Sequence, residues 1–149
     1  MRDLLESIDV HSNKDPYVLR LIERHPRLFW GELPIIRSDL PPGWFVLVDR
    51  LCSDIDTLLS DEQAEHFSVC QVKEKFHGLR FYWGFGRERV ERYDTVLERG
   101  SWPILPTRPE WLTLEARIYD LIEKAYEASV ATCEICGEPG NVQMHVHRR

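Results

Sequence analysis

Apolar side chains recur at helical spacing in three stretches of this chain. The first stretch begins after Asp15 and Pro16, and it predicts a short helix because aspartate caps a helix and proline suits its first turn. From Pro42 onward, apolar residues return at steps of three and four, which predicts an amphipathic core helix. A third apolar stripe predicts a helix over residues 111–131.

The second of these helices carries charged residues on its outer face. They are Asp49, Arg50, Asp54 and Asp56. A charged face opposite an apolar stripe is typical of a helix at a protein surface, so we interpret these side chains as solvated.

The segment FSVCQVKEKFHGLRFYW, residues 67–83, changes from helical spacing to alternation. Residues 67–76 favour strand structure, and the pair His77-Gly78 is expected to turn the chain with Gly78 at positive φ. Every second residue after the turn is large and apolar, namely Leu79, Phe81 and Trp83. The segment therefore predicts an antiparallel β-hairpin with one face buried on the helices.

Together these patterns predict an α+β fold in which three or four helices pack on a small antiparallel hairpin or sheet. We also expect a short extended piece at Ile35 and Ile36 and a helix in the charged segment 87–100. A chain of 149 residues suits one core, so we expect a single domain over residues 1–131 and a zinc-binding appendage over residues 132–149. Nine side chains are expected in the core, because their periods place them on common faces: Trp44, Val48, Leu51, Ile55, Leu79, Phe81, Leu114, Ile118 and Leu121.

The composition indicates a globular protein of a reducing compartment. Hydrophobic residues make up 43% of the chain and charged residues 30%, which is unlike a disordered segment. The amino terminus lacks the features of a secretory signal, and no apolar run approaches the ~20 residues that a membrane span needs. Cys52 and Cys70 lie in apolar surroundings, a poor arrangement for disulfides, so we expect a cytoplasmic protein.

Candidate metal ligands are concentrated near the C-terminus. Two residues separate Cys133 from Cys136, and a glycine follows the second cysteine. This spacing forms a tight knuckle in which both sulfurs face one point. His145 and His147 can face the same point from an extended strand, so the four residues predict a structural zinc site. One alternative is a reduced cysteine pair beside an incidental histidine-bearing terminus. A redox CxxC motif is a further alternative, which the position of the pair after a long helix disfavours.

The hairpin offers a second candidate site. Lys73, Lys75 and Arg80 stand among aromatic residues such as Tyr82, as in sheet-based RNA-binding proteins that stack bases and hold phosphates. The formal net charge of -6 opposes general binding to a phosphate backbone, and aromatic residues at period two more often form core. His77 is interpreted as a solvent-facing turn residue, because no nucleophile motif or Gly-rich phosphate loop accompanies it.

Three blocks of the sequence resemble a family of small uncharacterised proteins of bacteria and their phages. The blocks are PPGWFVLVDRLCSDI, QVKEKFHGLRFYW and SVATCEICGEPG. The resemblance implies the order helix, hairpin, helix and CxxCG, together with a cytosolic setting. Members of the family continue past the CxxCGxPG motif to a second Cys and His pair, where this sequence has His145 and His147 instead.

The tail also resembles, over a shorter stretch, the opening of HNH endonucleases and of the related zinc finger of intron reverse transcriptases. In those families a following helix completes the metal site that hydrolyses a phosphodiester. His145 matches the first histidine of that pattern, but the sequence ends at Arg149 with no later Asn and His to match. This resemblance therefore gives little support for catalysis.

These observations leave three functions open. The leading interpretation is a non-enzymatic protein-binding module, most concretely an immunity or inhibitor protein whose acidic surface meets the basic cleft of a toxin or defence enzyme. The second is a nucleic-acid-binding accessory protein that uses the basic and aromatic hairpin with the knuckle. The third is a minimal HNH-like metal-dependent nuclease, which the missing helix disfavours. We expect a protein partner, no membrane contact and no small-molecule substrate.

Overall fold

The structure is a computed structural model that describes residues 15–29, 38–85 and 109–140. Within these ranges it contains four α-helices and one two-stranded antiparallel sheet, which confirms the α+β class. None of the helices in these ranges is both long enough and apolar enough to cross a membrane. The expected helix over residues 87–100 and the expected extended piece at 35–36 lie outside the described residues.

The elements follow one another closely along the chain. Two short 3-10 turns, η2 and η3, lead directly into the two long helices. In chain order the elements are α2 (Pro16–Arg24), η2 (Pro42–Trp44), α3 (Phe45–Leu58), α4 (Asp61–His66), β1 (Phe67–Lys75), β2 (Gly78–Phe85), η3 (Pro109–Trp111) and α7 (Leu112–Val130). The three helices expected from apolar spacing are therefore present, as is the hairpin.

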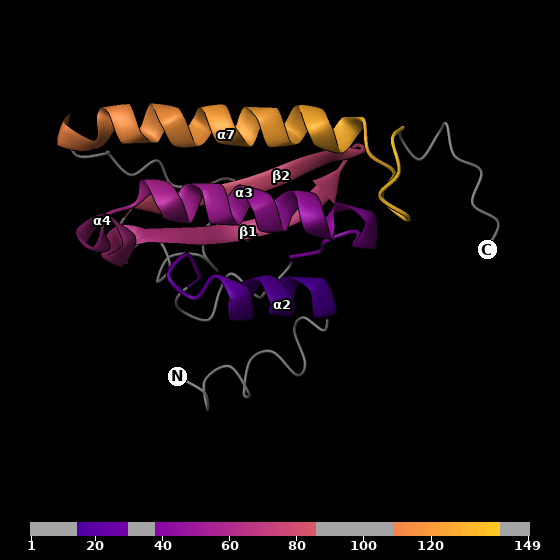
Figure 1. Cartoon of the computed structure of the whole chain (residues 1–149), viewed down its shortest axis with the longest axis horizontal. Coiled ribbons are helices and arrows are strands. Elements are labelled where there is room, and N and C mark those ends of the chain that lie inside the picture. Colours follow the sequence, from indigo (N-terminus) through magenta and orange to yellow (C-terminus); the bar gives the residue numbers. More distant parts are fainter. Residues whose placement is uncertain (1–14, 30–37, 86–108, 141–149) are drawn as a thin grey trace, which may run out of the picture.

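Helix α3 lies across the hairpin, with α7 alongside it on one side and α2 on the other (Figure 1). Contacts join α3 to α7 and α7 to β2. At one end of the molecule, the right of Figure 1, the start of α3, the hairpin turn and the chain after α7 come together. We call this region the tip end and define it by residues 43–46, 74–78 and 130–140.

The hydrophobic core lies between α3, α7 and the hairpin, as the apolar periods predict. Trp44, Val48 and Ile55 are fully buried, and Leu51, Leu79, Phe81 and Ile118 belong to the same buried cluster, against which Leu114 and Leu121 pack. Leu114 and Leu121 are only partly buried. Leu121 lines an open groove of about 610 Å³ between α3 and α7, which accounts for its remaining exposure.

Capping residues set the beginnings of two helices. Asp15 caps α2 as expected, since its Oδ1 accepts hydrogen bonds from the backbone N–H groups of Tyr17 and Val18. The short helix α4 was not expected from apolar spacing. It begins with a capping box in which Ser60 and Gln63 each accept a hydrogen bond from the other's backbone N–H.

The hairpin turn differs from the expected one. Phe76 and His77 occupy the two turn positions with φ of 54° and 63°, and Gly78 is the first residue of β2, paired with Lys75. The prediction that Gly78 takes positive φ is therefore wrong. A Cβ atom on Gly78 would lie 2.5 Å from Cε2 of Tyr126, so the glycine allows the ring of Tyr126 on α7 to pack against the start of β2.

Side-chain hydroxyls attach both edges of the hairpin to the rest of the fold. The buried Ser129 of α7 accepts a hydrogen bond from the backbone N–H of Leu79 at 3.0 Å. On the other edge, Ser38 accepts from the backbone N–H of Val72 at 3.1 Å, and Val72 accepts from the N–H of Asp39. These bonds satisfy backbone groups that a two-stranded sheet would otherwise leave unpaired.

The charged face of α3 is less solvated than its sequence suggests. Asp49 accepts two hydrogen bonds from the guanidinium of Arg24 and lies 2.7 Å from Nε2 of the buried His25. Arg27 donates one hydrogen bond to the carboxylate of Asp56 and another to the backbone carbonyl of Asp56. The hydrogen bond from Arg24 lowers the pKa of Asp49, burial opposes the shift, and the contact with His25 lowers the pKa further. Asp49 thus belongs to the seam that holds α2, whereas Arg50 and Asp54 are exposed as expected.

Replacement of Asp49 by Asn should therefore lower the free energy of unfolding at pH 7 by roughly 1–3 kcal/mol. Because the folded-state pKa of Asp49 is depressed, its contribution is present above the unfolded pKa of about 4 and is lost as the pH falls through the folded pKa. Chemical denaturation between pH 7 and pH 2 should show that the free energies of unfolding of wild type and D49N converge at low pH. The exposed Asp54→Asn is the control, and equal stability of D49N and wild type at pH 7 would contradict the prediction.

Candidate metal centre

The cysteine pair lies in a compact loop that follows α7 directly. Thr132 and Pro139 form an isolated antiparallel bridge that closes the loop. The backbone N–H of Cys133 donates to Glu138 at 2.8 Å, and that of Gly140 donates to the carbonyl of Ala131 at 2.7 Å. We call residues 132–140 the knuckle.

Backbone groups of the knuckle point at the first sulfur. The N–H of Ile135 donates to Sγ of Cys133 at 3.4 Å, and the N–H of Gly137 donates to the carbonyl of Cys133 at 3.0 Å. Gly137 has φ of 77°, a conformation that favours glycine. The glycine after the second cysteine thus allows the turn that the sequence predicts.

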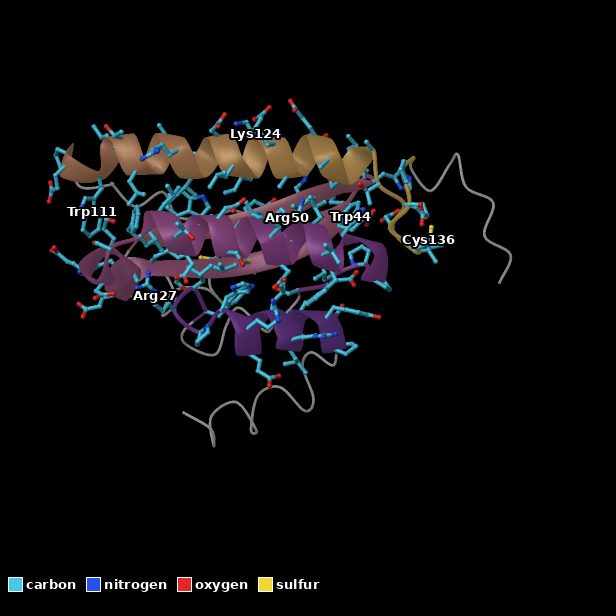
Figure 2. The ribbon with its side chains drawn as sticks, viewed as in Figure 1. Arg27, Trp44, Arg50, Trp111, Lys124 and Cys136 are labelled. Carbon is cyan, nitrogen blue, oxygen red and sulfur yellow. The ribbon has the colours of Figure 1, made fainter. Side chains whose placement is uncertain are left out.

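The two cysteines have different exposure. Cys133 is buried, whereas Cys136 is exposed at the surface of the knuckle (Figure 2). Burial disfavours a thiolate at Cys133, but hydrogen bonds from the backbone of Cys136 and Ile135 and from the Cys136 side chain favour it. Together these groups lower the pKa of Cys133. Donors aimed at a sulfur suit a metal-bound thiolate.

The knuckle is docked on the start of α3 by backbone contacts. The N–H of Gly43 donates to the carbonyl of Glu134 at 2.7 Å, and the indole Nε1 of the buried Trp44 donates to the carbonyl of Thr132 at 3.0 Å. A Cβ atom on Gly43 would lie 2.1 Å from the carbonyl oxygen of Cys133 and 2.6 Å from the nitrogen of Gly137. The loop is therefore held by the body of the protein as well as by its own turns.

The expected histidine ligands lie outside the described residues. Residues 141–149 contain both His145 and His147, so the structure places only Cys133 and Cys136 of the predicted set. The described residues of the knuckle contain the two cysteines, a backbone donor to Sγ of Cys133, and Gly137 at positive φ after the second cysteine.

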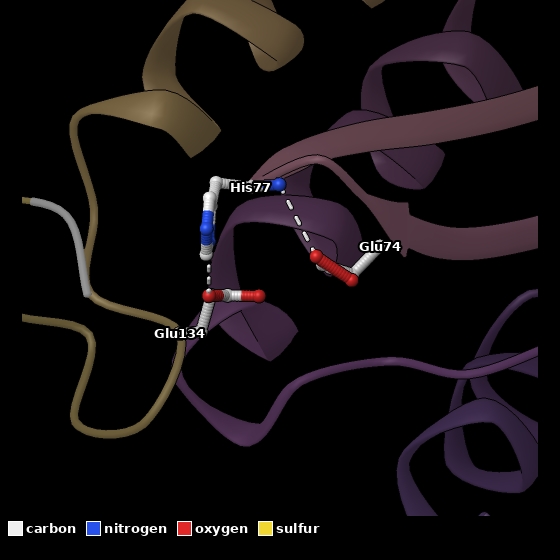
Figure 3. Close-up of side chains that lie close together, drawn as sticks. All are labelled: Glu74, His77 and Glu134. Carbon is white, nitrogen blue, oxygen red and sulfur yellow. Dashed lines mark hydrogen bonds and ion pairs between the residues drawn. The ribbon is translucent and has the colours of Figure 1, made fainter. Parts of the chain in front are cut away.

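A second group of ligand-type side chains lies next to the knuckle. Glu74, His77 and Glu134 approach one another so that one ligand atom of each lies within 4.8 Å of the others (Figure 3). Glu134 Oε2 lies 3.3 Å from Nδ1 of His77, and the His77 side chain is half-exposed. His77 therefore faces the knuckle as well as solvent. Sequence spacing gives no sign of this group, because 57 residues separate His77 from Glu134.

Carboxylates surround this group. Burial raises the pKa of Asp39, and the negative charge and hydrogen bonding of nearby carboxyl groups raise it further. These neighbours are Asp15, Glu74 and Glu134. Glu74 of β1 and Glu134 of the knuckle thus lie at the tip end, and Asp15 and Asp39 add negative charge next to it.

The basic and aromatic residues of the hairpin divide between its two faces. Lys73 pairs with Arg80 across the strands, and Tyr82 pairs with Gln71, so these side chains share one face of the hairpin. Arg80 already stacks over the ring of Tyr126, 5.8 Å from its centroid. Phe81 and Trp83 are buried in the core, as their alternation predicts, and cannot stack on bases.

The most exposed large apolar side chain in the described ranges lies on the hairpin turn. Phe76 is 81% exposed, and the ammonium of the neighbouring Lys75 lies 5.6 Å from the centroid of its ring. The sequence assigned Phe76 to a strand, so its position at the turn was not expected.

Protein-family models, curated proteins and solved structures were compared with this chain, and none of them matches it.

Replacement of Gly43 by Ala should detach the knuckle. All three atoms that the added Cβ would meet belong to the backbone, so no side-chain rotation can relieve the clash. We expect the free energy of unfolding to fall by about 1–3 kcal/mol, the usual effect of overpacking. Chemical denaturation measures the change, with the exposed Val46→Ala as a control that should stay within about 0.5 kcal/mol of wild type. Equal stability of G43A and wild type would show that the knuckle is not docked at this point.

Proposed function

We propose that this protein is a non-enzymatic protein-binding module that contacts its partner through the tip end. The observation that carries the proposal is the exposure of Phe76 at the hairpin turn, 81% of its accessible surface. Aromatic side chains commonly supply the residues that dominate binding energy at protein interfaces. Val46 and Ile135 add exposed apolar surface at the same end.

The turn that carries Phe76 is held in an unfavourable conformation. A bulky residue in the left-handed region is unfavourable by roughly 1–2 kcal/mol, and such strain persists only where surrounding contacts enforce it. Here Glu74 accepts the backbone N–H of His77 at 3.1 Å, and the His77 ring contacts Glu134 of the knuckle. Gly78 is packed against Tyr126. A turn whose backbone is already held in one conformation loses little further backbone entropy on binding, which favours affinity.

The charge of the protein supports a basic partner. The formal net charge is -6, and carboxylates such as Asp39 and Glu134 lie close to the tip. Complementary charge speeds association and selects the partner, so an acidic tip suits a protein with a basic cleft. With the resemblance to small bacterial and phage proteins, this favours an immunity or inhibitor protein that acts on a toxin or defence enzyme.

The knuckle is proposed to hold a structural zinc ion through Cys133 and Cys136, with His145 and His147 as the completing pair. A closed site of four protein ligands leaves no open position for catalytic water, in keeping with a non-enzymatic protein. The thiols of Cys52 and Cys70 are buried and reduced in the structure, and a cytoplasmic location suits them.

Nucleic-acid binding is the second candidate function. The pairing of Lys73 with Arg80 across the hairpin, beside the half-buried Tyr82, is the observation that favours it. Lys75 extends the basic row toward the turn. Only one aromatic side chain of the predicted set shares this face, and the overall charge opposes a phosphate backbone, so protein binding is the better supported function.

We expect one zinc ion per chain in protein that is purified in reduced form without a histidine tag. Elemental analysis measures this, and Cys136→Ser should remove the zinc that the knuckle holds without disturbing the core, because Cys136 is exposed. Metal content near zero in the reduced wild type would contradict the zinc site. Full retention in a double His145→Ala, His147→Ala variant would show that other residues complete it.

Replacement of Phe76 by Asn should abolish partner binding and leave the fold intact. Asparagine tolerates the left-handed region, so relief of strain offsets the lost contact with Lys75, and the free energy of unfolding should stay within about 1 kcal/mol of wild type. Co-purification from the native host, followed by mass spectrometry, measures binding. The matched control is Leu112→Gln, which removes another exposed apolar side chain, at the start of α7.

The expected result is a stoichiometric protein partner with wild type and L112Q but not with F76N. A partner that F76N retains in full would contradict a tip-centred surface. Recovery of nucleic acid in place of protein, lost when Lys73 and Arg80 are both replaced by Gln, would favour the second candidate function.

A further inference from the structure

Glu74, His77 and Glu134 bring two carboxylates and one imidazole together outside the cysteine site (Figure 3). The three residues come from the end of β1, the hairpin turn and the knuckle. Imidazole and carboxylate are the ligand types of Mn²⁺, Fe²⁺ and Zn²⁺ sites, whereas the thiolates of the knuckle suit zinc. The chemistry of this group therefore differs from that of the cysteine pair.

The spacing of the group suits a single ion. Two atoms bound to one first-row cation through bonds of about 2.0–2.2 Å lie roughly 3.0–3.5 Å apart. Nδ1 of His77 and Oε2 of Glu134 are 3.3 Å apart, within that interval. The carboxylate of Glu74 is held beside them, because its Oε1 accepts the backbone N–H of His77 at 3.1 Å. Small rotations of the two glutamates would bring all three ligand atoms to one cation.

The backbone fixes two of the three ligands before any ion arrives. The carbonyl of Glu134 accepts the N–H of Gly43 at 2.7 Å, and its side chain is only 16% exposed. The strained turn sets the direction of His77, with φ of 63°. Ligands that are already positioned lose little conformational entropy when they bind.

The charges around the group also favour a cation. In the described ranges, His77 is the basic group that pairs with Glu134, and neither a lysine nor an arginine forms an ion pair with Glu74. Asp39 lies close enough to both glutamates for their charges to act on it. A divalent cation would neutralise carboxylates that otherwise repel one another.

We infer that Glu74, His77 and Glu134 bind one first-row divalent cation through oxygen and nitrogen, with water in the remaining positions. The ion joins the hairpin turn to the knuckle, so it fixes the turn that carries Phe76. Its three ligands are distinct from the cysteine pair and the expected histidines, although Glu134 lies between the two cysteines in the chain.

Mn²⁺ is the probe that separates this site from the cysteine pair, because it prefers oxygen and nitrogen ligands to thiolates. Metal-free, reduced full-length protein is titrated with Mn²⁺, and free and bound ion are distinguished by electron paramagnetic resonance. Pulsed measurements on the bound ion report coupling to a coordinated imidazole nitrogen. The variants are Glu134→Gln and His77→Asn, since asparagine tolerates the turn conformation. The control is Glu127→Gln, an exposed carboxylate on α7, and thermal denaturation verifies that each variant is folded.

We expect one Mn²⁺ per chain with imidazole nitrogen coupling. Even residues that only support ligands contribute roughly ten- to a hundredfold to metal affinity, so loss of a ligand should weaken binding by at least about tenfold. E134Q and H77N should both show that loss, H77N should also lose the nitrogen coupling, and E127Q should match wild type. Either of two outcomes overturns the inference: no bound Mn²⁺ at millimolar concentration, or binding that folded E134Q and H77N leave unchanged. Retention of metal by a Cys133→Ser, Cys136→Ser variant separates the site from the proposed zinc knuckle.

Discussion

The close approach of two backbone segments at Gly43 is the constraint on which the tip end depends. The chain before α3 meets the knuckle so closely that a single Cβ atom would lie 2.1 Å from the carbonyl oxygen of Cys133. The next residue, Trp44, is fully buried in the core and donates its indole N–H to Thr132. The knuckle is thus anchored to the hydrophobic core through one glycine and one tryptophan. The contacts with the start of α3 therefore orient the knuckle without a metal ion.

The hairpin turn depends in turn on that anchored knuckle. Glu134 accepts the Gly43 N–H through its backbone and faces the ring of His77 through its side chain. On the other side, the ring of Tyr126 packs against Gly78, where a Cβ atom would lie 2.5 Å from its Cε2. The strain at Phe76 and His77 is therefore set by tertiary contacts. Local preference would have placed a glycine or asparagine at the turn, and departures of this kind are expected at functional or strained sites.

Local signals in the sequence predicted the main elements. Asp15 and Pro16 predicted the start of α2, and apolar periods predicted α3, the hairpin and α7, because caps and periodicity act over a few residues. The signal for α4 was also present, in the capping box of Ser60 and Gln63, but α4 has only six residues and too little apolar periodicity to reveal itself.

Features that depend on distant residues were not predicted. The turn position of Gly78 depends on Tyr126 of α7, and the pairing of Asp49 depends on Arg24 of α2. The group of Glu74, His77 and Glu134 forms only when the knuckle docks beside the hairpin. The loop that carries Cys133 and Cys136 was predictable because its turn is local. The other two predicted ligands, His145 and His147, lie outside the residues that the structure describes.

Amide hydrogen exchange on the intact protein tests most directly whether the knuckle, the start of α3 and the hairpin form one preorganised unit. The informative amides are those of Gly43, Cys133 and Gly140, which donate to Glu134, Glu138 and Ala131, and that of Leu79, which donates to Ser129. If the three segments form one unit, these amides should be protected to a similar degree and open together. This expectation would be contradicted by rapid exchange at Gly43, Cys133 and Gly140 while Leu79 stays protected, because the knuckle would then move independently of the body.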